Sequence, residues 1–127
     1  MKKVIIDTNF LLACVSQKID FFHDIKVMGI KILIPKQVIN ELHRIQKSSK
    51  KLKFKDASAL ALKILEANKE DYRIIDLSKY GQNTDKGIKN YSNKNSEVIV
   101  ATLDRGIKRN VLRHKMVIRN RKKLEIV

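Results

Sequence analysis

The chain has 127 residues and a formal net charge of +15, because 28 Lys and Arg residues outnumber 13 Asp and Glu residues. This length, with a hydrophobic content of 43%, predicts one globular domain over residues 1–127. The apolar runs are too short for a membrane span or a signal peptide, so we expect a cytoplasmic protein with no membrane partner. Cys14 is the single cysteine, which excludes an internal disulfide and a cysteine-based zinc cluster.

The excess of basic residues predicts a polyanionic partner. Each phosphate that Lys or Arg contacts releases bound counterions, so a small domain this basic is expected to bind nucleic acid. An anionic membrane is the competing partner, but the sequence has no basic amphipathic helix with a large aromatic face. Charge that only keeps the protein soluble is the remaining alternative.

The N-terminal segment KVIIDTN, residues 3–9, combines a strand with the start of a helix. Val4–Ile6 is a short β-branched run, typical of a strand that is buried on both faces. The run stops at Asp7, and an apolar helical pattern begins at Phe10. Ligands and metal ions bind at the carboxyl ends of the strands in open α/β sheets, which makes Asp7 a candidate site residue. A helix cap is its alternative role, because Asp and Thr are favoured cap residues.

Strands and helices alternate along the rest of the chain, which predicts one parallel α/β sheet. The segment at 47–55 (KSSKKLKFK) has two interpretations that the sequence leaves open, a solvated linker or a loop that grips phosphate. The expected elements are a short helix that begins at Phe10 and ends near 16–18, a helix at 19–28, a strand at 31–34, a helix at 37–46, the loop at 47–55, an amphipathic helix at 54–65, a strand at 73–77, a polar loop at 80–84, a short helix at 85–91, a strand at 97–101, a helix at 103–112, a strand at 115–119 and a final apolar segment at 124–127.

Four acidic residues lie on connections that leave the carboxyl ends of predicted strands. Asp7 and Asp104 follow the first and fourth strands, Asp85 follows the third, and Glu41 lies on the helix after the second. These side chains are expected to converge on one rim of the sheet. Glu41 borders the apolar stripe of its helix and needs a partner, for which Arg44 is the local alternative. Separate helix caps are the alternative role for the three aspartates.

Clustered carboxylates repel one another unless a cation is bound, and hard oxygen ligands select Mg²⁺ or Mn²⁺. A carboxylate-bound divalent metal beside a basic surface is suited to phosphodiester hydrolysis, because the metal activates water and stabilises developing charge. His23, His43 and His114 are scattered through the sequence and do not indicate a histidine base.

Five segments carry a resemblance to a known family: DTNFLL at 7–12, VINEL at 38–42, NTD at 83–85, VIVATLDRGIKRNV at 98–111 and VIRNRKKLEI at 117–126. In their order and spacing the acidic motifs resemble those of the PIN-domain ribonucleases, a metal-dependent family, over nearly the whole chain. The closing segment resembles the archaeal branch that is related to ribosomal RNA processing nucleases.

The resemblance implies a three-layer α/β/α sandwich whose sheet has five parallel strands in the order 3-2-1-4-5. In that order Asp7 and Asp104 face each other across the crevice. The resemblance also implies an endoribonuclease that acts by metal-activated water, with RNA as its partner. The implied site holds Mg²⁺ or Mn²⁺ on Asp7, Asp85 and Asp104, with Glu41 completing the acidic set and Asn9 and Thr102 orienting the carboxylates.

Ribosomal RNA processing, with a ribosome-assembly partner, is one role that this resemblance implies. The toxin of a toxin–antitoxin pair, with an antitoxin as partner, is a second role, and a non-catalytic RNA-binding PIN module is a third. Many family members are dimers, which makes a homodimer a candidate assembly. The candidate RNA-binding residues are Lys50, Lys51, Lys53, Arg105 and Lys108.

Overall fold

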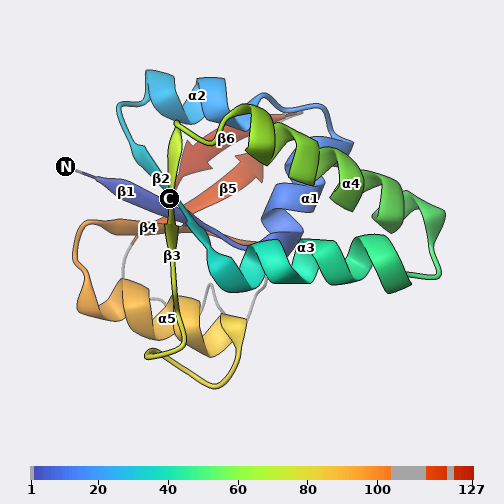
Figure 1. The fold of residues 1–127 in the computed structure, drawn as a ribbon. Helices are drawn as coiled ribbons and strands as arrows, with labels where there is room; N and C mark the ends of the chain where they lie inside the picture. The colour runs from blue at the N-terminus through green and yellow to red at the C-terminus, as the bar shows by residue number, and fades with distance from the viewer. Residues whose placement is uncertain (1, 104–113, 120–121) are drawn as a thin grey trace.

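The computed structural model describes residues 2–103, 114–119 and 122–127, and its strands form one sheet between layers of helices (Figure 1). None of the helices described is long and apolar enough to cross a membrane. The elements are β1 (Lys3–Ile6), α1 (Thr8–Ser16), α2 (Phe21–Val27), β2 (Lys31–Pro35), α3 (Lys36–Ser48), α4 (Leu52–Ala67), β3 (Tyr72–Ile75), α5 (Thr84–Lys94), β4 (Val98–Ala101), β5 (Lys115–Arg119) and β6 (Lys123–Ile126).

The sheet has the strand order β3-β2-β1-β4-β5-β6. Strands β1 to β5 are all parallel, which confirms the predicted order 3-2-1-4-5. The sixth strand, β6, pairs antiparallel with β5 at the edge, with Val117 opposite Glu125. The sequence predicts only an apolar segment at 124–127, so β6 is an addition to the predicted fold.

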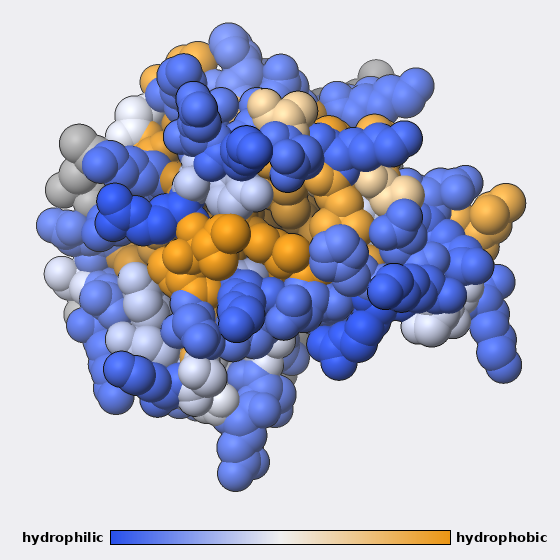
Figure 2. Space-filling model, in the orientation of Figure 1, coloured by the Kyte–Doolittle hydropathy of each residue, from blue (hydrophilic) through white to orange (hydrophobic). Residues whose placement is uncertain are grey.

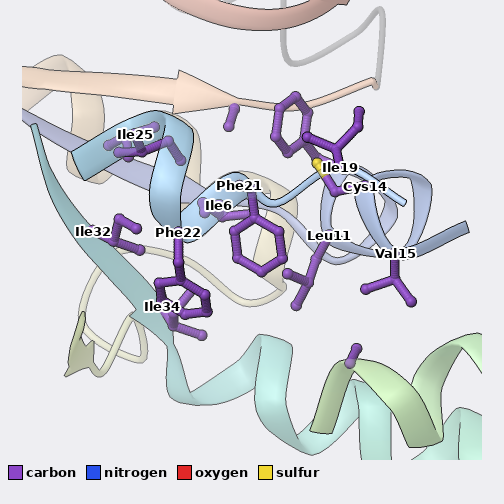
Figure 3. Close-up of a cluster of buried hydrophobic side chains, with 14 of the residues drawn as sticks. Ile6, Leu11, Cys14, Val15, Ile19, Phe21, Phe22, Ile25, Ile32 and Ile34 are labelled. Atoms are coloured by element: carbon purple, nitrogen blue, oxygen red, sulfur yellow. The ribbon is translucent and has the colours of Figure 1, made fainter. Parts of the chain in front are cut away.

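Helices on both faces of the sheet explain why its central strands are apolar along their whole length. Val4 and Ile6 of β1 face a large cluster with α1 to α4, whereas Ile5 faces a smaller one with α5. Figure 3 shows Phe21 and Phe22 packed between sheet and helices in the larger cluster. Because β1 is covered on both faces, the residue that follows it is held firmly at the end of the sheet.

The predicted loop at 47–55 is wrong in its extent. Helix α3 continues to Ser48 and α4 begins at Leu52, so only residues 49–51 connect them. Lys and Leu are good helix formers, and this local preference extends both helices into the basic segment. The two helices pack against each other as a hairpin that projects beyond the sheet (Figure 1). The helix expected at 103–112 falls almost entirely on residues 104–113, outside the described residues.

Candidate active site

Asp7 lies directly after the central strand β1, and only 5% of its surface is exposed. Its backbone N–H donates to the carbonyl of Ala101 (3.0 Å), which extends the pairing of β1 with β4 by one residue. Each carboxylate oxygen accepts a hydrogen bond: Oδ1 from the Thr8 N–H (2.8 Å) and Oδ2 from the Thr102 hydroxyl (2.9 Å). Asp7 is therefore the N-cap of α1, as the capping alternative predicts, but it also binds a residue 95 positions away.

Glu41 is held near Asp7 by a hydrogen bond from Thr8, the residue that follows Asp7. The Thr8 hydroxyl donates to Glu41 Oε2 at 3.0 Å, across 33 positions of sequence. In the described part of the chain Glu41 forms no ion pair with Arg44, so the local alternative for its partner is wrong. Thr8 is buried and links two of the predicted site acids. Thr8 is not among the predicted site residues, although a hydroxyl next to the key aspartate is a signal for it.

Asp85 lies in the first turn of α5 and is exposed. The cap of that helix is Asn83, whose side chain accepts from the Lys86 N–H at 2.9 Å, so capping does not explain Asp85. The negative charge of Asp85 acts on Asp7 and contributes to raising its pKa. The connections after β1 and β3 thus bring these two acids into one electrostatic neighbourhood.

Burial raises the pKa of Asp7 from its usual 3.8 to about 6. Loss of water around the carboxylate is the largest cause, because it disfavours the charged form. The hydrogen bonds from Thr102 and Thr8 oppose this by stabilising the charged form, whereas the charges of Asp85 and Glu41 raise the pKa further. A bound cation stabilises a charged carboxylate most where that carboxylate is buried and lies near other negative charges, as Asp7 does.

The other predicted site residues divide into three groups. Thr102 is buried and contacts Asp7, as expected for a residue that orients the carboxylate. Asn9 is exposed on α1, and its side chain makes no hydrogen bond within the described residues. The tip of the α3–α4 hairpin carries the predicted RNA-binding residues Lys50, Lys51 and Lys53, whereas Asp104, Arg105 and Lys108 lie outside the described residues.

The described donors suit a hard divalent cation by their chemistry. Asp7, Glu41 and Asp85 offer oxygen ligands only, which is the set that Mg²⁺ and Mn²⁺ prefer. Within residues 2–103, 114–119 and 122–127, no three His, Cys, Asp or Glu side chains lie close enough together to hold a metal ion. The fourth predicted acid, Asp104, lies outside the described residues.

Comparison with known proteins finds sequences that are similar over nearly the whole chain. Residues 4–123 match the family described as "PIN like domain". The chain is 34% identical to Ribonuclease VapC4 of Methanocaldococcus jannaschii over 132 residues, which cover 99% of this chain and 97% of the relative.

Two solved structures share the fold. The PIN domain endonuclease Utp24 superposes with a TM-score of 0.76 at 24% identity, covering 98% of this chain and 90% of that chain. VapBC2 from Rickettsia felis, solved bound to a DNA fragment from their promoter, gives a TM-score of 0.59 at 19% identity, with coverage of 89% and 98%.

Proposed function

Because the chain belongs to the PIN-domain family, we propose that it is a metal-dependent endoribonuclease whose acidic site is Asp7, Glu41, Asp85 and Asp104. The observation that carries this proposal is the buried Asp7 carboxylate at the end of β1, fixed by two hydrogen bonds and destabilised by the charges of two other acids. A purely structural cap needs neither the burial nor the acidic neighbours. The relative named Ribonuclease VapC4 supports RNA as the substrate.

The described side chains have distinct parts in this proposal. Asp7 is the fixed metal ligand, since both of its oxygens are oriented by donors and retain lone pairs for a cation. Thr8 holds Glu41 beside it through the 3.0 Å hydrogen bond. A bound Mg²⁺ or Mn²⁺ supplies an activated water and stabilises charge on the phosphate oxygens. The net charge of +15 attracts the polyanionic RNA to the protein.

Cleavage of a labelled RNA with and without divalent metal tests the proposal. The parent is expected to cleave in Mg²⁺ or Mn²⁺ and to stop in chelator, and Asp7→Asn is expected to be inactive. Asp20→Asn is the matched control, because Asp20 caps α2 through the His23 N–H and Asn caps equally well. Cleavage that persists in chelator would refute metal dependence, and RNA binding without any cleavage would favour a non-catalytic module.

The cellular role has two candidates, each with an observation behind it. Full-length identity of 34% to Ribonuclease VapC4 favours the toxin of a toxin–antitoxin pair, with an antitoxin as partner. The closing motif VIRNRKKLEI at 117–126 favours ribosomal RNA processing with a ribosome-assembly partner. Induced expression in a heterologous host separates them. A toxin arrests growth and Asp7→Asn does not, whereas a processing enzyme leaves growth intact and cuts precursor ribosomal RNA.

A further inference from the structure

The end of the α3–α4 hairpin combines positive charge with exposed apolar side chains. We call residues 47–54 the hairpin tip. Leu52 and Phe54 are 70% and 42% exposed there, although both are large hydrophobic residues. Figure 2 shows an apolar group at this end of the molecule, surrounded by hydrophilic surface. The tip also carries four exposed lysines, at positions 47, 50, 51 and 53.

The charges of the tip have no acidic partner within residues 2–103, 114–119 and 122–127. None of these four lysines forms an ion pair with any residue that the structure describes. Lys51 instead places its Nζ 5.5 Å from the centre of the Phe54 ring, in a cation–π contact. The backbone around it is fixed, since the Lys51 N–H donates to Ser49 Oγ (3.3 Å) and the Phe54 N–H to the Lys51 carbonyl (3.1 Å). A positioned ring with lysines around it is thus presented to solvent.

This combination fits a nucleotide of a single strand better than either feature does alone. Phosphates neutralise lysines that have no acidic partner, and an unpaired base stacks on an exposed aromatic ring. The phosphates of a duplex could also pair with the lysines. Its base faces are already stacked inside the helix, however, so Phe54 would remain exposed. An acidic protein segment would also pair with the lysines, but it would not need the flat face of the ring.

The tip is joined to the acidic site by a single rigid element. Glu41 and Ser48 lie on the same helix, α3, seven residues apart, or about 10 Å along the axis. Arg44 lies between them, on about the same side as Glu41, and is exposed without an ion pair in the described chain. A strand that enters at the tip therefore meets a further cation on its way to the carboxylates.

We propose that the hairpin tip holds an unpaired nucleotide of the RNA substrate, with its base on Phe54 and its phosphates on Lys50, Lys51 and Lys53. Arg44 then guides the strand along α3, so that the bond to be cut lies a few nucleotides from the nucleotide held at the tip. This inference rests on the proposed function in taking RNA as the ligand and the acidic site as the place of cleavage. It adds the hairpin tip as the place that holds one unpaired nucleotide, at a fixed spacing from the cleavage site.

Fluorescence gives a direct test, because the chain contains no tryptophan. Phe54→Trp places a fluorophore at the tip, and Leu60→Trp is the matched control at a position of α4 that is 48% exposed. A short oligouridine, added in chelator so that nothing is cut, is expected to quench the tip tryptophan and to leave the control unchanged. A duplex RNA of the same length is expected to quench neither. Equal responses at the two positions would overturn the proposal.

Affinity gives a second, independent readout. Phe54→Ala is expected to weaken oligouridine binding by about 5- to 150-fold in chelator, the range of losing one stacked base, and Leu60→Ala to leave it unchanged. Unchanged affinity of Phe54→Ala would overturn the proposal that a base stacks on Phe54. Absence of cleavage by the parent in Mn²⁺ would refute the proposed function instead, while binding in chelator still decides the role of the tip.

Discussion

Replacing Asp7 by Asn should stabilise the metal-free protein at neutral pH. The folded pKa of about 6 lies above the usual 3.8, so ionising this carboxylate costs folding free energy. At 1.36 kcal/mol per pKa unit, the difference corresponds to about 3 kcal/mol in the free energy of unfolding. Asn removes the charge but accepts at only one oxygen, so one of the bonds from Thr8 and Thr102 weakens, at about 1 kcal/mol. The expected net gain is about 2 kcal/mol.

The sign of the pH dependence follows from the direction of the pKa change. A group with a raised folded pKa contributes fully to stability below the unfolded pKa, near 3.8, and that contribution is lost as the pH rises through about 6. Thermal melts in chelator should therefore show Asp7→Asn more stable than the parent at about pH 7.5, by roughly 3 °C for each kcal/mol. At about pH 4 the advantage should disappear, and the parent should be equally or more stable.

Metal supplies the second half of this test. Saturating Mn²⁺ should stabilise the parent by mass action, by about 2.7 kcal/mol at a hundred times the dissociation constant. Asp7→Asn should respond much less, because it lacks the charged ligand. Asp20→Asn, which changes an exposed helix cap, should resemble the parent at every pH and with metal. If Asp7→Asn melts at or below the parent at about pH 7.5 in chelator, and both respond alike to Mn²⁺, the acidic site is wrong.

Three further predictions concern other parts of the chain. Thr102→Val, which removes a hydroxyl donor to the buried aspartate, should lower metal affinity or cleavage rate by about 10- to 100-fold in a Mn²⁺ titration, and an unaltered titration would contradict the orienting role. Changing Lys50, Lys51 and Lys53 together to Gln should flatten the slope of log affinity against log salt by about two for single-stranded RNA. An identical slope would show that these lysines do not contact RNA phosphates. Burial raises the pKa of the Cys14 thiol to about 12, so a thiol reagent should label it slowly in the native protein and quickly in urea, and rapid native labelling would contradict its burial.

The sequence predicts the sheet well because its strands are buried on both faces. Runs such as Val98–Ala101 are apolar throughout, and helices separate them at the spacing of parallel crossovers. The prediction fails where burial is one-sided. Strand β6 at the sheet edge shows the pattern of exposed and buried residues in alternation, over only four residues, and four residues give a weak periodic signal. The prediction of a loop at the hairpin tip fails for another reason. The charge of its lysines indicates a loop, but their helix propensity is high.

The place of the acidic residues at strand ends predicts that they lie near one another, and the family resemblance names Thr102, but the local sequence does not show which hydroxyl meets which carboxylate. The Thr102–Asp7 and Thr8–Glu41 hydrogen bonds span 95 and 33 positions, and they form only because β4 and β2 both lie beside β1. Local periodicity carries no information about such neighbours, whereas the strand order does. Asp7 shows how the two levels combine: the same carboxylate starts α1, as its local sequence predicts, and meets Thr102 across the sheet, as only the topology dictates. A helix cap and a metal ligand are therefore compatible roles for one aspartate, and mutation to Asn separates them, because Asn can still cap α1 through its one amide oxygen but carries no charge.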